Sequence, residues 1–245
     1  MVIIKSSLLN KFNKIVFGFS TKVSETHSEP FNYNMSLSVG DDEKIVLKNR
    51  EAFAKYLNLA PQNIAYQKQI HSDIIKYVDC GGTHGESDAL ITDKPNIGLA
   101  ISSADCSAVF IYDSVKNVIA GIHSGWRGTQ KRIVTKTLLE MKTRFSYQPE
   151  DLFAYIAPSI SQNNYEVGKE VAKQFDQKYL KVKGDKFLLD VSANNYDMLQ
   201  EFGIPSANIE KSDLCSYANN KLLHSYRREG AKSGRALGII AIVEK

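Results

Sequence analysis

Hydrophobic residues occur along this chain mostly in runs of five to eight, bounded by polar, turn-forming segments. Two central runs, residues 107–112 and 118–123, are rich in β-branched and aromatic side chains. The sequence DSVKN at 113–117 separates them and has the composition of a tight turn. The pattern therefore predicts a β-hairpin, followed by the small-residue turn Ser124–Gly125 and then by a helix.

The expected register of this hairpin places a thiol near an imidazole. If Tyr112 pairs with Val118, Cys106 lies opposite Ser124 and one position from His123. Neighbouring strands are about 4.8 Å apart, so the two side chains are expected to be close. A one-residue offset puts them on opposite faces of the sheet unless a bulge or the preceding loop reorients Cys106.

The rest of the chain alternates further short strands with amphipathic helices. The other predicted strands are 15–21, 64–70, 74–78, 88–92, 98–103, 152–158, 209–217 and 236–243. The predicted helices begin after Gly40 with Asp41 or Asp42 as cap, begin near Thr129, and cover 166–180 and 188–202. Strands outnumber helices and several neighbours are joined as hairpins. This favours an α+β fold with mixed or antiparallel strands over a doubly wound parallel sheet.

Composition indicates one ordinary globular domain. The 245 residues contain 43% hydrophobic and 24% charged residues, and no linker, repeat or low-complexity tract interrupts them. We therefore expect a single domain over 1–245. No apolar run reaches about 18 residues, and the first twelve residues do not resemble a signal peptide, so we expect a cytoplasmic protein without a membrane partner.

Charge and cysteine content further limit the functional class of the protein. The net charge is +4, with basic residues scattered among acidic ones, which argues against nucleic-acid binding. The three cysteines, Cys80, Cys106 and Cys215, are widely spaced and odd in number. Such a set favours a metal-binding or reactive thiolate over a disulfide framework.

Three residues at predicted strand ends, His71, Cys106 and His123, could share a metal ion. Two imidazoles and a thiolate are a catalytic zinc set that leaves one tetrahedral position open. Singly, His71 would more often be a surface or capping histidine, whereas for His123 a functional role and a chance position in a core strand weigh equally. Copper also accepts this donor set, but a multicopper site needs more histidines than the three others, His27, His84 (expected to be exposed in a glycine-rich loop) and His224.

Many short motifs occur in an order that is itself informative. They are FGFSTK (17–22), NMS (34–36), VGDD (39–42), QIHSD (69–73), DALIT (88–92), ADC (104–106), IHSGWRGT (122–129), IAPSI (156–160), YEVG (165–168), SYRREG (225–230) and SGR (233–235). In this order they resemble the family variously labelled polyphenol oxidase, laccase-domain protein and purine nucleoside phosphorylase. The resemblance extends from about residue 17 to the C-terminus.

The resemblance implies a single α/β/β/α layered domain, with zinc held by His71, Cys106 and His123. It also implies an enzyme that cleaves adenosine, inosine and S-methyl-5'-thioadenosine with phosphate and deaminates adenosine. The expected partners are therefore purine nucleosides and phosphate, with no nucleic acid, and the protein would be a monomer or homodimer.

Individual roles can be assigned as expectations. Arg127, Lys22 and Arg228 are candidates for holding phosphate, and by resemblance Asn34 would bind substrate. Asp105 could act as general acid toward the leaving base, or as a partner to a ligating histidine. For the adjacent Arg227 and Arg228 alone, a solvated turn with surface salt bridges is the simpler interpretation.

Two departures from the family pattern concern the phosphate and metal sites. The family has an arginine and a glycine pair after the FST strand, where this chain has Lys22-Val23-Ser24-Glu25. A lysine loses the bidentate geometry of arginine toward phosphate. Residues 159–162 (SISQ) replace a cysteine-containing loop, so that loop supplies no further thiol.

Three alternatives remain open at this stage. The first is a Cys–His hydrolase or deamidase with Cys106 as nucleophile and His123 or His71 as base. The second is a weak copper-dependent polyphenol oxidase. The third is a binding module that a metal stabilises but that performs no catalysis.

Overall fold

The computed structural model describes residues 1–24 and 29–244, so Glu25 and His27 lie outside the described residues. Two six-stranded sheets form the body. The first has the order β1 (Ile3–Ile4), β2 (Ile15–Ser20), β15 (Ala236–Ile242), β7 (Gly98–Ser103), β3 (Ile64–Lys68), β5 (Gly82–Glu86). The second has the order β14 (Ile209–Lys211), β10 (Leu152–Ile156), β8 (Ser107–Asp113), β9 (Val118–Ser124), β6 (Ala89–Thr92), β4 (Ile75–Tyr77). Both sheets mix parallel and antiparallel pairs.

A small third sheet and the helices complete the fold. The sheet has the order β11 (Glu166–Val167), β13 (Lys186–Leu189), β12 (Leu180–Lys183). The helices are α1 (Glu43–Tyr56), α2 (Trp126–Gln130), α3 (Ile133–Phe145), α4 (Lys169–Ala172), α5 (Val191–Glu201) and α6 (Tyr226–Glu229). Among the described residues, no helix has both the length and the apolar character that crossing a membrane requires.

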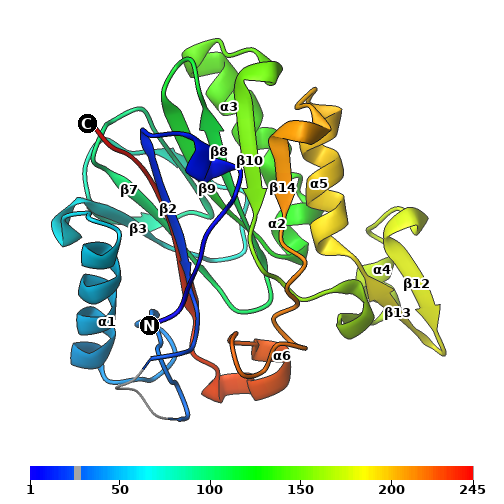
Figure 1. The fold of residues 1–245 in the computed structure, drawn as a ribbon. Helices are drawn as coiled ribbons and strands as arrows, with labels where there is room; N and C mark the ends of the chain where they lie inside the picture. The colour runs from blue at the N-terminus through cyan, green and yellow to red at the C-terminus, as the bar shows by residue number, and fades with distance from the viewer. Residues whose placement is uncertain (25–28, 245) are drawn as a thin grey trace.

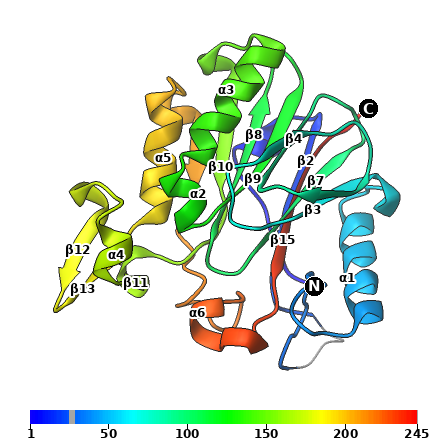
Figure 2. The same ribbon diagram turned by 180° about the vertical axis from the view of Figure 1, so that it is seen from behind.

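The two large sheets pack face to face, and helices cover their outer faces (Figures 1 and 2). Phe17, Leu99 and Phe110 belong to the core between the sheets. Helices α3 and α5 pack on the outer face of the second sheet, and α1 packs on that of the first. Because both faces of the central strands are buried, their sequences read as continuous apolar runs. The α/β/β/α layered, mixed-strand fold expected from the sequence is confirmed.

The predicted hairpin of β8 and β9 is present, but the predicted register is wrong by one residue. Asp113 pairs with Val118, and Ala108 lies opposite His123. The reason is the turn: the Asp113 carboxylate accepts hydrogen bonds from the backbone N–H groups of Val115 and Lys116. Asp113 therefore remains in the strand and closes a four-residue loop instead of a five-residue one.

The helix predicted over 166–180 is wrong. This segment contains β11, the single turn of α4 and the beginning of the β12–β13 hairpin, whose turn contains Gly184 at φ +61°. The helix predicted over 188–202 begins only at Val191, after the cap Asp190. Likewise, the helix expected from Thr129 is divided into α2 and α3 by Arg132, which has a left-handed backbone conformation.

Two smaller expectations also fail. The strand predicted over 209–217 is confined to β14, which ends at Lys211. His84 lies in β5, not in a loop, and is half-buried, with its Nε2 3.0 Å from the carbonyl oxygen of Cys80. The glycines that flank His84 suggested a loop, but parallel pairing with β3 makes the segment a strand.

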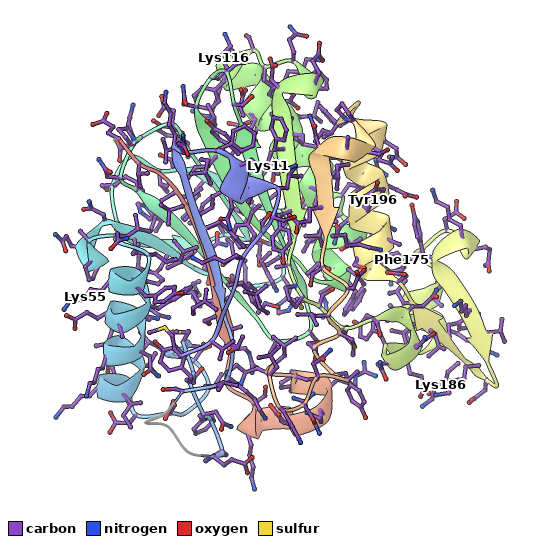
Figure 3. All side chains as sticks on the ribbon, viewed as in Figure 1. Lys11, Lys55, Lys116, Phe175, Lys186 and Tyr196 are labelled. Carbon is purple, nitrogen blue, oxygen red and sulfur yellow. The ribbon has the colours of Figure 1, made fainter. Side chains whose placement is uncertain are left out.

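The third sheet projects from the body as an arm (Figures 1 and 2). Figure 3 shows Lys186 far out on this arm and Phe175 closer to the body. Phe175, Tyr179 and Leu189 form a small apolar cluster at its root, and Trp126 of α2 packs against that cluster. The arm is therefore attached to the same helix that follows His123.

Candidate metal-binding active site

The structure brings His71, Cys106 and His123 together at one end of the two sheets. His71 follows β3 of the first sheet, His123 lies in β9 of the second, and Cys106 lies in the turn that crosses from β7 to β8. Their ligand atoms all lie within 4.8 Å of one another. The Cys106 Sγ is 3.8 Å from the Nε2 of His71, and the two imidazole rings lie 4.8 Å apart at 79°.

The turn between β7 and β8 determines the orientation of the Cys106 side chain, which the hairpin pattern left open. Cys106 precedes β8 and is therefore free of the alternation of side chains along that strand. Asp105 before it has a left-handed backbone conformation, with φ +86°, which is uncommon for a residue other than glycine. This turn lets the thiol approach both histidines despite the register.

The three donors match the requirements of a tetrahedral metal ion. With zinc–sulfur and zinc–nitrogen bonds of about 2.3 and 2.0 Å, ligand atoms in a tetrahedral site are roughly 3.6 Å apart. The observed 3.8 Å between Cys106 and His71 is close to this separation. A thiolate and two imidazoles leave one position for water or substrate, so the residues present fit a catalytic metal ion. Among the described residues, no other cluster of three metal-ligating side chains occurs.

A buried aspartate that the sequence reasoning missed supports this cluster. Asp88 is fully buried, and its Oδ1 lies 2.8 Å from Nδ1 of His123. Burial disfavours the charged form of Asp88, but hydrogen bonds from His123 and Ser72 outweigh burial and lower the pKa of this carboxyl to about 2. The available signal in the sequence was the position of Asp88 at the start of the DALIT motif. In the structure, that motif borders the two histidine motifs.

The electrostatics of the cluster favour a charged thiolate. Burial opposes ionisation of the Cys106 thiol, but the nearby imidazole of His123 outweighs it and lowers the pKa of Cys106. Burial also opposes protonation of His123, yet the Cys106 sulfur and the Asp88 carboxylate raise the pKa of that imidazole. A thiolate beside two imidazoles is the form of this site that binds a metal cation.

Asp105 is held beside this cluster by two donors. Its Oδ1 accepts a hydrogen bond of 2.6 Å from the Ser216 hydroxyl, and its Oδ2 one of 2.6 Å from the backbone N–H of Arg227. The carboxylate that bonds to His123 is Asp88, not Asp105. The structure therefore gives the role of carboxylate partner to His123 to Asp88 and not to Asp105.

The predicted phosphate-binding cations occupy different settings. Arg127 in α2 is exposed, and its guanidinium lies 4.3 Å from the centre of the Trp126 ring. Lys22 is half-buried, with its Nζ 3.4 Å from a carboxylate oxygen of Glu229. Arg228 donates to the backbone carbonyls of residues 216, 217 and 223 and to Glu229.

Asn34 is fully buried and forms several local hydrogen bonds. Its amide donates to the carbonyl of Ser36 and to Asp41, and its Oδ1 accepts from the backbone N–H groups of Ser36 and Arg235. Asn34 thus joins the NMS and SGR segments. The structure therefore places the side chain in a loop-bracing network.

Arg227 and Tyr165 are further residues of this region that were not predicted as site residues. The Arg227 guanidinium lies 5.1 Å from the centre of the Tyr165 ring and donates to the carbonyl of Glu166. Burial raises the pKa of the Tyr165 phenol, and the Cys106 sulfur acts in the same direction. Tyr165 packs against the apolar cluster at the root of the arm, and the YEVG motif carried the signal for it.

Comparison with known proteins identifies the family. The sequence model of the family described as multi-copper polyphenol oxidoreductase laccase matches residues 16–243. The chain belongs to this laccase family. The family resemblance noted from the ordered motifs is thereby confirmed.

Three known proteins are similar to this chain over most of their length. A purine nucleoside phosphorylase of Bacteroides thetaiotaomicron is 34% identical over 86% of this chain and 85% of its own. The adenosine deaminase RL5 of an unknown prokaryotic organism is 31% identical over 82% of this chain and 84% of its own. The crystal structure of the Bacillus licheniformis hypothetical protein YfiH superposes with a TM-score of 0.90, at 30% identity, covering 94% and 93% of the two chains. The names of the first two relatives support an enzyme of purine nucleoside metabolism.

Proposed function

We propose that this protein is a zinc-dependent purine nucleoside phosphorylase that acts on adenosine, inosine and S-methyl-5'-thioadenosine and also deaminates adenosine. The observation that carries the proposal is the cluster of three candidate metal ligands, His71, Cys106 and His123. Relatives named purine nucleoside phosphorylase and adenosine deaminase support the choice of substrate.

The chain's own residues would divide the work as follows. Zinc held by His71, Cys106 and His123 would supply a Lewis acid and a water of lowered pKa. Asp105, held in place by Ser216 and the Arg227 amide, would donate a proton to the leaving base.

Phosphate binding would fall to cationic side chains. We assign it to Arg127 and Lys22, with Arg227 as an additional donor. Arg228, whose guanidinium N–H groups all have partners, would bind phosphate only by exchanging those partners. Asn34 would act on the substrate through the segment that it holds. The partners are then purine nucleosides and phosphate and not nucleic acid, in a cytoplasmic monomer or homodimer.

The test is product analysis of adenosine incubated with zinc-loaded protein, with and without phosphate. Adenine formed only with phosphate identifies phosphorolysis, and inosine formed without phosphate identifies deamination. Cys106→Ala should abolish both products, whereas Cys80→Ala, at an exposed thiol outside the cluster, should retain them. If zinc-loaded wild type forms no product from any of the three nucleosides, the assignment is wrong.

A Cys–His hydrolase is the second candidate, because Cys106 has a lowered pKa and lies 3.8 Å from the His71 imidazole. Alkylation by iodoacetamide separates the two candidates. A zinc-bound thiolate is protected until a chelator is added, whereas a nucleophilic thiolate reacts at once. Exposed Cys80 reacts in both states and serves as the internal standard for mass spectrometry. Copper bound in place of zinc, together with oxidation of a phenol, would instead support the polyphenol oxidase alternative.

A further inference from the structure

Asp88 receives an unusual number of hydrogen bonds for one carboxylate. Its Oδ1 accepts from Nδ1 of His123 at 2.8 Å and from the backbone N–H of His71 at 3.1 Å. Its Oδ2 accepts from the backbone N–H and the hydroxyl of Ser72, both at 2.6 Å, and from the backbone N–H of Ile70 at 3.3 Å. The carboxylate is fully buried, and its hydrogen bonds with His123 and Ser72 form away from solvent.

These bonds join ligands that come from different sheets. Asp88 directly precedes β6, which pairs with β9, the strand that carries His123. His71 instead follows β3 of the first sheet. A single carboxylate therefore contacts both histidines of the cluster, through the ring of one and the backbone of the other.

The backbone of His71 needs such support. Its φ is +58°, in the left-handed region that residues other than glycine seldom occupy. A conformation of this kind costs of order 1 kcal/mol or more and persists where the surroundings determine it. Three consecutive N–H groups around His71, from residues 70 to 72, donate to Asp88 and hold the turn that presents the imidazole.

The ring of His123 is fixed by the same carboxylate. With a proton on Nδ1 directed at Asp88, Nε2 is left to face Cys106 and His71. The peptide N–H of His123 also donates to the Asp88 carbonyl, at 2.7 Å. Both the tautomer and the direction of this ligand therefore depend on residue 88.

We infer that Asp88 is the positioning residue of the metal centre and holds both histidines in their metal-binding geometry before the ion arrives. This inference rests on the proposed metal site but not on the proposed reaction. A carboxylate that orients a histidine ligand typically contributes 10- to 100-fold to metal affinity. Because Asp88 holds two histidines, we expect the upper part of that range.

The experiment measures zinc affinity by competition with a chromophoric chelator. Asp88→Asn should bind zinc about 100-fold more weakly than wild type. Asp93→Asn is the matched control, because Asp93 follows the other end of β6 and accepts a hydrogen bond of 2.6 Å from the Tyr77 hydroxyl. The control should bind zinc like wild type. Equal affinity of Asp88→Asn and wild type would overturn the inference.

A second measurement needs no variant. Nitrogen-15 NMR of the zinc-loaded wild type should place the proton of His123 on Nδ1 and the metal on Nε2. The opposite assignment would overturn the inference even if Asp88→Asn does not fold. Neither readout uses nucleoside turnover, so an inactive protein that shows both results contradicts the proposed function and leaves the role of Asp88 intact. A wild type that binds no zinc contradicts both.

Discussion

The backbone of Gly125 lies directly against the Cys106 sulfur. A Cβ atom built on Gly125 would be 2.7 Å from Sγ of Cys106 and 3.2 Å from Cδ2 of His71. The glycine itself has φ −70° and ψ 175°, which any residue can adopt. Position 125 therefore requires glycine because a side chain would have no space beside two candidate metal ligands. The backbone conformation itself does not require glycine.

Replacing Gly125 by alanine should weaken metal binding without unfolding the protein. The added methyl group displaces the Cys106 sulfur, so we expect at least a tenfold loss of zinc affinity, comparable to loss of a supporting contact. The metal-free protein should keep its stability, because alanine lowers the conformational entropy of the unfolded chain. This effect favours the folded state by about 0.4–1 kcal/mol. Chelator competition and thermal unfolding measure the two quantities.

Gly128→Ala provides the control for this substitution. The three atoms nearest to a Cβ at Gly128 would be Cγ2 of Ile133 at 3.2 Å and the backbone oxygens of His123 and Ser72 at 3.4 and 3.5 Å, with no metal-ligating atom among them. Zinc affinity should therefore be unchanged. A Gly125→Ala protein with wild-type affinity would show that the sulfur has room to move.

The neighbours Arg227 and Arg228 should respond differently to substitution by lysine. All N–H groups of the Arg228 guanidinium are used, on three backbone carbonyls and Glu229. Arg228→Lys should therefore lower the free energy of unfolding by about 2 kcal/mol, since several partly buried acceptors lose their donors. Arg227→Lys should change stability little but raise the KM for phosphate, because a lysine loses the bidentate fork.

Denaturant unfolding and phosphate-dependent kinetics test this pair together. An Arg228→Lys protein of wild-type stability with a raised phosphate KM would instead show that Arg228 contacts phosphate directly. That result would support the original expectation for Arg228 and would require its guanidinium to exchange partners when phosphate binds.

The layered fold could be predicted from the sequence because its signals are local and repeated. Strand segments such as 118–122 and 236–243 are apolar without interruption, as expected for strands between two covered faces. The prediction of a helix over 166–180 was wrong because the spacing of Val167, Val171 and Phe175 matches a helical period. In the structure these residues instead pack around the root of the arm, a tertiary arrangement with no local signature.

The candidate site was predictable in part for a similar reason. His71, Cys106 and His123 are uncommon residue types at strand ends, and the family motifs gave their grouping. Asp88 was not found, because a lone aspartate before a strand ordinarily indicates a turn. Its role depends on the contact between two loops from different sheets, which only the folded arrangement provides.

Zinc should stabilise the folded protein in proportion to its occupancy of the site. At a free zinc concentration 100 times the dissociation constant, linkage adds about 2.7 kcal/mol to the free energy of unfolding. Thermal unfolding with zinc and after chelation measures this gain, and Cys106→Ala should remove it. Stabilisation of that variant equal to wild type would place the zinc elsewhere on the chain.

His224 should make the protein sensitive to mild acid. The side chain is 2% exposed, its Nε2 lies 3.3 Å from the carbonyl of Tyr33, and its Nδ1 has no hydrogen-bond partner among the described residues. Burial lowers the pKa of His224 to about 4. Lys22 and Arg235 act in the same direction as burial, whereas the hydrogen bond with the Tyr33 carbonyl and the charge of Glu229 oppose the lowering of this pKa.

The direction of the pH effect follows from this lowered pKa. An unfolded histidine titrates near pH 6.5, so between about pH 6.5 and 4 the unfolded chain binds a proton that the folded protein does not. The contribution of His224 to the free energy of unfolding is therefore fully present above pH 6.5. It falls by about 3 kcal/mol in all as the pH is lowered to 4. Denaturant unfolding of metal-free wild type and His224→Gln at several pH values isolates this contribution. The variant should lose about 3 kcal/mol less than wild type across that interval, and parallel curves would show that His224 becomes protonated in the folded protein.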